Sequence, residues 1–95
     1  MPWIIAHAGP PLDAESAGRL AAELARSAAT VLRLTPEDVL VQVHPALAAA
    51  GAGALVTIAG RLRDPEVELD LRQAVQALMA AQLQLPEDAV GVVRL

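Results

Sequence analysis

The chain has 95 residues and a formal net charge of −4, with no lysine and no cysteine. This length suits one small domain, and the acidic balance argues against nucleic acid as a partner. The lack of cysteine excludes a disulfide framework and a thiolate nucleophile. No apolar run approaches the ~20 residues of a membrane span, and the N-terminus lacks the features of a signal peptide. We therefore expect a cytoplasmic protein that binds neither nucleic acid nor membrane.

The first half of the sequence predicts a strand, a helix and a second strand. Residues 3–7 (WIIAH) and 39–43 (VLVQV) have the apolar composition of strands, and residues 13–34 between them have helical periodicity. Asp13 is suited to be the N-cap of this helix. Its apolar face is formed by Leu20, Leu24, Ala28 and Val31.

The second half repeats the same order of elements. Residues 54–60 (ALVTIAG) and 89–95 (AVGVVRL) are the expected strands, and the helix between them begins with Asp64 as cap and Pro65 in its first turn. Its apolar face is formed by Val67, Leu71, Val75 and Leu78.

The two halves also resemble each other in sequence. LRLTPEDVLVQV (32–43) is similar to LQLPEDAVGVVRL (83–95), and both place Pro-Glu-Asp between a helix and a strand. We therefore interpret residues 1–95 as a single domain built from pseudo-repeats at about 2–44 and 53–95. The small residues of the linker PALAAAGAG (45–53) offer no functional side chain, and we expect the linker to be flexible.

This order of elements defines an α/β (α+β) fold with a four-stranded sheet and two helices on one face. It fits either a ferredoxin-like sandwich or two parallel β-α-β crossovers related by a pseudo-twofold axis. The strands are apolar almost throughout, which indicates burial on both faces. Because the helices cover one face only, we expect a partner subunit on the other.

Pro2 is the first candidate for chemistry. Proline is tolerated at the start of a strand because it needs no hydrogen-bond donor there. If Met1 is removed, however, the nitrogen of Pro2 becomes a free secondary amine, which can act as an acid or a base.

Arg61 and Arg63 are the second candidate, in the segment GRLRDP (60–65) between a strand and a helix. Side chains two residues apart in an extended segment point the same way, so both guanidinium groups could meet one carboxylate. The nearby helix N-terminus also favours an anion. The alternative is a solvated loop that balances the acidic start of the helix.

Asp38 is a third candidate, because it opens the second strand and could stand beside the first. Asp88 occupies the same place in the second half, however, and a Pro-Glu-Asp turn needs no catalytic reason. His7 and His44 are far apart in sequence and are interpreted as isolated structural histidines, and Trp3 as a core or interface residue. No glycine-rich phosphate loop or metal-ligand spacing is present.

Together these features resemble the tautomerase superfamily, whose fold is typified by macrophage migration inhibitory factor and 4-oxalocrotonate tautomerase. Its members begin Met-Pro-strand, lose the methionine and use the proline nitrogen. The similarity is greatest to malonate semialdehyde decarboxylase, on the match of Arg61-Leu62-Arg63 after the third strand, Pro36-Glu37-Asp38 before the second, and His44. The stretch GPPLDAE (9–15) lacks the arginine that small tautomerases carry there.

The resemblance implies a homotrimeric enzyme that acts on a small keto acid without metal or organic cofactor. Pro2 would be the acid–base residue, Arg61 and Arg63 would bind the substrate carboxylate, and Asp38 would orient water or the proline. Both keto–enol tautomerisation and decarboxylation remain open. The alternative is a non-catalytic ligand-binding module, either a trimer of this fold or an ACT-type, ferredoxin-like domain.

Overall fold

Four strands and two long helices follow the order β-α-β-β-α-β that the sequence predicts. A computed structural model describes residues 1–46 and 50–95, so part of the predicted linker, 47–49, lies outside the described residues. The strands and helices are β1 (Trp3–Ala8), α1 (Ala14–Leu32), β2 (Leu40–Pro45), β3 (Ala54–Ala59), α2 (Pro65–Leu83) and β4 (Val90–Arg94). Short 3-10 turns, η1 (Pro36–Asp38) and η2 (Glu87–Ala89), precede β2 and β4. None of the described helices combines the length and the apolar character needed to cross a membrane.

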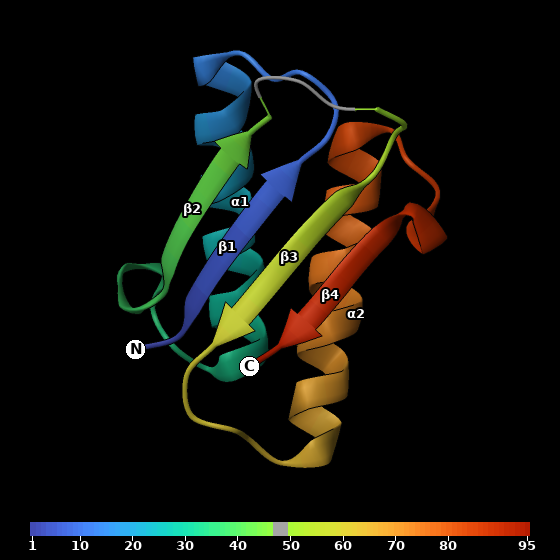
Figure 1. Cartoon of the computed structure of the whole chain (residues 1–95). Coiled ribbons are helices and arrows are strands. Elements are labelled where there is room, and N and C mark those ends of the chain that lie inside the picture. Colours follow the sequence, from blue (N-terminus) through green and yellow to red (C-terminus); the bar gives the residue numbers. More distant parts are fainter. Residues whose placement is uncertain (47–49) are drawn as a thin grey trace.

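The strand order in the sheet is β2-β1-β3-β4. Within each half the two strands are parallel neighbours, β1 with β2 and β3 with β4, and the halves join through the antiparallel pair β1–β3. In a ferredoxin-like sheet another strand separates the two strands of each β-α-β unit. The direct pairing seen here therefore excludes that alternative and confirms two β-α-β units joined about the sheet centre (Figure 1).

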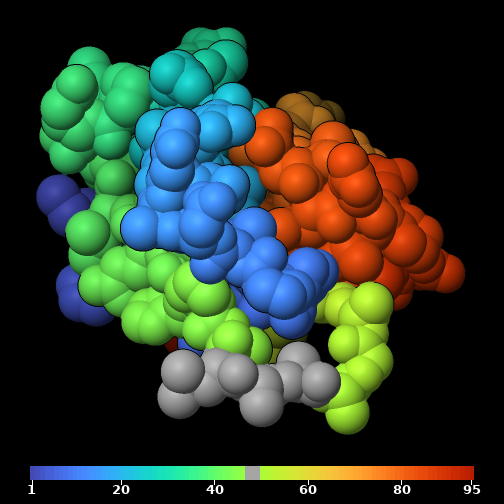
Figure 2. All heavy atoms as spheres, turned by 90° about the horizontal axis from the view of Figure 1, so that it is seen from above, coloured from blue at the N-terminus to red at the C-terminus, as the bar shows by residue number. Residues whose placement is uncertain are grey.

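Both helices pack side by side on one face of the sheet (Figure 1), and Gln82 Nε2 of α2 donates to Glu23 Oε2 of α1 at 2.7 Å. Figure 2 views the molecule from the end where α1 begins and α2 ends. The predicted apolar faces are confirmed at most positions, but Val31, Val67 and Leu78 are only half-buried. The buried helix residues are Leu20, Leu24, Ala28, Ala29, Leu32, Leu71, Val75, Met79, Ala80 and Leu83. The buried positions shift around each helix along its length, because 3.6 residues per turn do not return every fourth residue to the same face.

The two helices begin differently, although an aspartate is the N-cap of each. Asp13 Oδ1 accepts the N–H of Ser16 at 2.7 Å, and this hydrogen bond lowers the pKa of the Asp13 carboxyl below its ordinary value. The side chain of Asp64 accepts no helix N–H. The prediction of Asp64 as the cap residue is confirmed, and this cap works without a side-chain hydrogen bond.

The two helices end in the same way. Arg33 and Gln84 have left-handed backbone conformations, with φ of 57° and 56°. In each case the following residue donates its N–H five residues back, from Leu34 to Ala29 and from Leu85 to Ala80, both at 2.9 Å. This is the Schellman ending, which usually places glycine at the left-handed position. The repeated LRL and LQL sequences thus fold into one local structure twice.

The face of the sheet opposite the helices is uncovered in the single chain (Figure 1). Trp3 of β1, Leu55 of β3 and Val93 of β4 are 50%, 45% and 42% exposed on this face. The strands therefore carry apolar side chains on both faces, as the sequence indicates, but only the helix side is buried within one chain.

Candidate functional site

Pro2 is buried at the end of the sheet where β1 and β2 begin and β3 and β4 finish (Figure 1). Its carbonyl accepts the N–H of Leu40, the first residue of β2, at 3.0 Å. On the β3 side it lies against Gly60, where a Cβ would be 3.2 Å from the Pro2 Cα. Pro2 is thus held between the start of β2 and the residue that follows β3.

Gly60 opens the β3–α2 loop, residues 60–64, which carries Arg61 and Arg63. Its φ of +128° is a conformation that residues with a Cβ rarely adopt, so glycine is needed where the chain leaves β3 beside Pro2. The loop has no regular secondary structure. Arg61 therefore immediately follows Gly60, the residue that lies beside Pro2.

Arg61 and Arg63 line one pocket of about 760 Å³ between the β3–α2 loop, the end of α1 and the first turns of α2. Within residues 1–46 and 50–95, neither guanidinium takes part in a hydrogen bond or an ion pair. Pro2 does not line this pocket. It lies beside Gly60, which directly precedes the pocket residue Arg61. Both arginine side chains are consequently available to a ligand.

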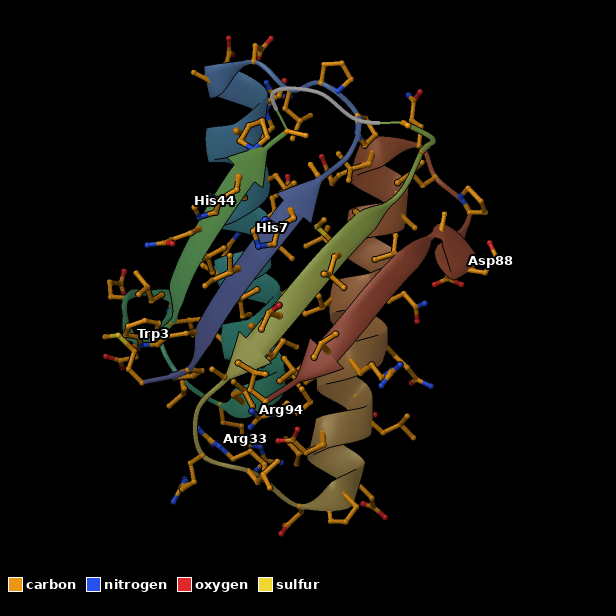
Figure 3. All side chains as sticks on the ribbon, in the orientation of Figure 1. Trp3, His7, Arg33, His44, Asp88 and Arg94 are labelled. Atoms are coloured by element: carbon orange, nitrogen blue, oxygen red, sulfur yellow. The ribbon has the colours of Figure 1, made fainter. Side chains whose placement is uncertain are left out.

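A third arginine, Arg33, also lines this pocket from the end of α1 (Figure 3). Sequence analysis missed it, although Arg33 stands where the second half has the neutral Gln84. Asp64, Glu66 and Asp70 line the same pocket, so three cationic and three carboxylate side chains line it together. An anion bound here would have to lie on the arginine side of the pocket.

Arg94 and Glu68, which sequence analysis also missed, hold the β3–α2 loop from beneath. Arg94 Nε donates to Glu68 Oε1 at 2.7 Å, and both side chains are 20% exposed. The hydrogen bond from Arg94, supported by one from the Arg63 N–H, lowers the pKa of Glu68 below its ordinary value, although partial burial opposes the shift. The feature that could have identified Arg94 is the parallel register of β3 and β4, which places it beside Ile58 near the end of β3.

Asp38 is not part of this pocket. It is exposed in η1, and its Oδ2 accepts the hydroxyl of Thr35 at 2.9 Å while its N–H donates to the Thr35 carbonyl at 2.9 Å. These contacts are those of a local turn motif. Asp38 nevertheless lies at the same end of the sheet as Pro2, because Leu40, two residues later, binds the Pro2 carbonyl.

His7 and His44 are neighbours, and the expectation that they are isolated is wrong. The parallel register of β1 and β2 pairs them on the uncovered sheet face, with ring centroids 5.3 Å apart (Figure 3). His44 Nε2 also forms a 3.1 Å hydrogen bond with Gln42 Oε1. In the part of the chain that the structure describes, no three His, Cys, Asp or Glu side chains are grouped to hold a metal ion.

No protein-family model matches the chain, and no curated protein matches its sequence. Solved structures do match. The structure of Pt0534 inactivated by 2-oxo-3-pentynoate has a TM-score of 0.86 at 19% identity, covering 98% of this chain and 83% of that one. Macrophage migration inhibitory factor from Giardia lamblia has a TM-score of 0.83 at 11% identity, covering 99% and 97%. A fused 4-OT, described as a symmetric trimer, has a TM-score of 0.84 at 18% identity, covering 98% and 83%.

These similarities confirm the fold predicted from the sequence. The chain has the α+β tautomerase-like fold shared by 4-OT and macrophage migration inhibitory factor. Identities between 11% and 19% carry the fold and leave activity to be argued from the residues of this chain.

Proposed function

We propose that the chain is an enzyme of the tautomerase superfamily that acts on a small keto acid with Pro2 as its acid–base residue. Removal of Met1 would free the proline nitrogen. Arg61 and Arg63 would bind the substrate carboxylate, and the amine would move a proton at the carbon or oxygen next to the carbonyl. Malonate-semialdehyde-type decarboxylation, with the arginines holding the carboxylate out of the carbonyl plane, is the other reaction that this arrangement suits. No metal or organic cofactor is needed for either.

The observation that carries this proposal is the closeness of Pro2 to Gly60, the residue from which the arginine-bearing loop begins, where a Cβ would lie 3.2 Å from the Pro2 Cα. The residue that would supply the amine is buried, and the loop that follows Gly60 supplies two guanidinium groups that have no hydrogen-bond or ion-pair partner among the described residues. Burial and nearby cations both favour the neutral form of an amine, which is the form that accepts a proton. Asp38 has a weaker part in the proposal, because its carboxylate is committed to Thr35. Its role would be to orient water at this end of the sheet.

The first test is the state of the proline nitrogen. Intact-mass spectrometry should show a mature chain that begins at Pro2, and Pro2→Ala should slow the tautomerisation of an enolisable keto acid such as phenylpyruvate by about 10²–10⁴-fold. A matched control inserts one alanine between Met1 and Pro2, which keeps the proline but converts its nitrogen to an amide. Unchanged turnover in both variants removes Pro2 from the mechanism and leaves a non-catalytic protein of this fold.

A second test uses the compound named with the Pt0534 structure. The neutral amine of Pro2 would add to the triple bond of 2-oxo-3-pentynoate at the carbon distal to the ketone, forming a C–N bond while a proton is taken up at the neighbouring carbon. Peptide mass mapping should place one reagent mass on Pro2. Labelling elsewhere, or none, contradicts a reactive amine at this position.

We also propose that the chain is a homotrimer, with the uncovered sheet face buried between subunits. The exposed apolar side chains of Trp3, Leu55 and Val93 support this, because a stable monomer rarely leaves such a face open. Sedimentation equilibrium at micromolar concentration should give three times the chain mass, and Val93→Arg should lower it. A wild-type monomer overturns the proposal.

A further inference from the structure

Arg94 engages the β3–α2 loop through the main chain. Its Nη2 donates to the carbonyls of Gly60 at 3.1 Å and Arg61 at 3.0 Å, and its Nη1 donates to those of Ile58 at 3.2 Å and Leu95 at 2.9 Å. With Nε on Glu68, all five N–H donors of the guanidinium are used. A single side chain of β4 thus binds two successive carbonyls at the start of the loop.

Glu68 completes the attachment from the side of α2. One carboxylate oxygen, Oε1, accepts Arg94 Nε at 2.7 Å, and the other, Oε2, accepts the main-chain N–H of Arg63 at 2.9 Å. Oε2 also lies 3.4 Å from Arg94 Nη2. The backbone is therefore held at residues 60 and 61 by Arg94 and at residue 63 by Glu68.

The contacts that Arg94 and Glu68 make with the loop involve its backbone and not its side chains. The pair binds the loop entirely through main-chain groups, whereas the Arg61 and Arg63 side chains extend into the pocket without an engaged partner in the described ranges 1–46 and 50–95. A loop without regular structure would otherwise lose conformational entropy on gripping a ligand. A backbone fixed in advance removes that cost from binding.

We propose that Arg94 and Glu68 are positioning residues, which fix the backbone of residues 60–63 so that Arg61 and Arg63 face a carboxylate together. This inference rests on the proposed function for the identity of the ligand, and on the contacts above for the positioning itself. Neither Arg94 nor Glu68 lines the pocket that Arg61 and Arg63 line.

The decisive variant is Arg94→Lys, since lysine keeps the charge beside Glu68 but cannot present the planar fork that reaches several carbonyls. Glu68→Gln is the second, because an amide NH₂ in place of one oxygen leaves either Arg94 or the Arg63 N–H without its acceptor. The matched control is the exposed ion pair of α1, in which Arg19 Nη2 lies 3.5 Å from Glu15 Oε1. Arg19→Lys and Glu15→Gln make the same chemical changes away from the loop.

Two readouts are needed, both on the full chain in its native assembly. Amide hydrogen exchange at residues 60–63 reports the backbone, and calorimetric titration with malonate reports the arginine pair. We expect both loop variants to accelerate exchange at these residues and to raise the malonate Kd by about 10- to 100-fold, the scale on which small misplacements act. Both control variants should match the wild type.

The outcomes distinguish the two proposals. Unchanged exchange in both Arg94→Lys and Glu68→Gln overturns the positioning role, whatever binds. Faster exchange with an unchanged malonate Kd shows that the pair stabilises the loop without setting the arginine geometry, which also overturns it. If wild-type protein binds no malonate, the carboxylate ligand of the proposed function fails, whereas accelerated exchange in the variants still supports backbone fixation by the pair.

Discussion

Gly60 and Pro2 are neighbours at the end of the sheet, and a Cβ built on Gly60 would lie 3.2 Å from the Pro2 Cα. Gly60→Ala would place a methyl group there and would also strain a residue with φ of +128°. We expect a loss of stability of about 1–3 kcal/mol. On the proposed function we also expect a fall in turnover, because Pro2 and Arg61 would move apart. Thermal melting and a keto-acid assay measure the two effects.

Gly18→Ala is the matched control for this substitution. Gly18 lies within α1, and a Cβ there would meet nothing within 4 Å. Alanine should therefore raise stability by about 0.5–1 kcal/mol because it restores helix propensity. Equal effects of the two substitutions would contradict the special geometry at Gly60.

The arginine pair should matter for binding and not for folding. Arg61→Ala and Arg63→Ala remove cations from the start of α2, where a positive charge is mildly unfavourable, so the melting temperature should stay constant or rise slightly. Each should weaken malonate binding by about 1.5–3 kcal/mol. Arg26→Ala, on the exposed side of α1, controls for the loss of one charge, and equal malonate affinity in all four proteins would reduce the pair to a solvated loop.

Arg33 and Gln84 form an internal comparison, because both are left-handed residues at equivalent helix ends. Replacement of either by glycine relieves the strain of a Cβ in this conformation, and should raise stability by a few tenths to about 1 kcal/mol after the extra entropy of the unfolded chain. Arg33→Gly should in addition weaken malonate binding, since Arg33, unlike Gln84, lines the pocket that Arg61 and Arg63 line. Identical malonate affinity in both variants would exclude Arg33 from the site.

The Glu68 carboxyl should make stability depend on acid. Its pKa is lowered in the folded chain by the hydrogen bond from Arg94, so its contribution is fully present above the unfolded value of about 4.3. That contribution is lost as the pH falls through the lowered folded pKa. The stability difference between wild type and Glu68→Gln should therefore be large at pH 7 and shrink below about pH 4.3, as urea titrations at several pH values would show.

Glu15→Gln provides the baseline for that experiment, since it removes one carboxylate from an exposed pair. Asp13 also has a lowered pKa, but it is present in all three proteins and cancels in the differences. A wild-type–Glu68→Gln difference that stays constant down to pH 3 would show that the charge of Glu68 adds nothing to the fold.

Local signals were sufficient to predict most of the fold. Helical periodicity and the Asp13 cap placed α1 within two residues of its observed ends, 13–34 against Ala14–Leu32. Direct pairing of β1 with β2 could not be predicted in the same way. The ferredoxin-like sandwich and the fold with two parallel β-α-β crossovers have the same order of elements. The choice depends on which edges meet, and this is a property of the packed sheet.

The site was predictable only where its residues are close in sequence. Arg61 and Arg63 were found because they flank a single leucine, whereas Arg94 reaches them only through the register of β3 and β4. His7 and His44, 37 positions apart, become neighbours by the same kind of pairing. Thr35 and Asp38 are a different case, because a hydroxyl and a carboxylate three residues apart are a readable turn signal.

The central place of β1 affects how the chain must fold. β1 is the first strand to be synthesised, and its two neighbours lie at different distances along the sequence. β2 follows after one helix, whereas β3 begins about 50 residues after β1. During synthesis the first β-α-β unit therefore has one edge of β1 unpaired until the second unit arrives. The antiparallel joining of the halves is the most non-local step and the one expected to limit the folding rate. Until it occurs, that open edge can pair with another nascent copy.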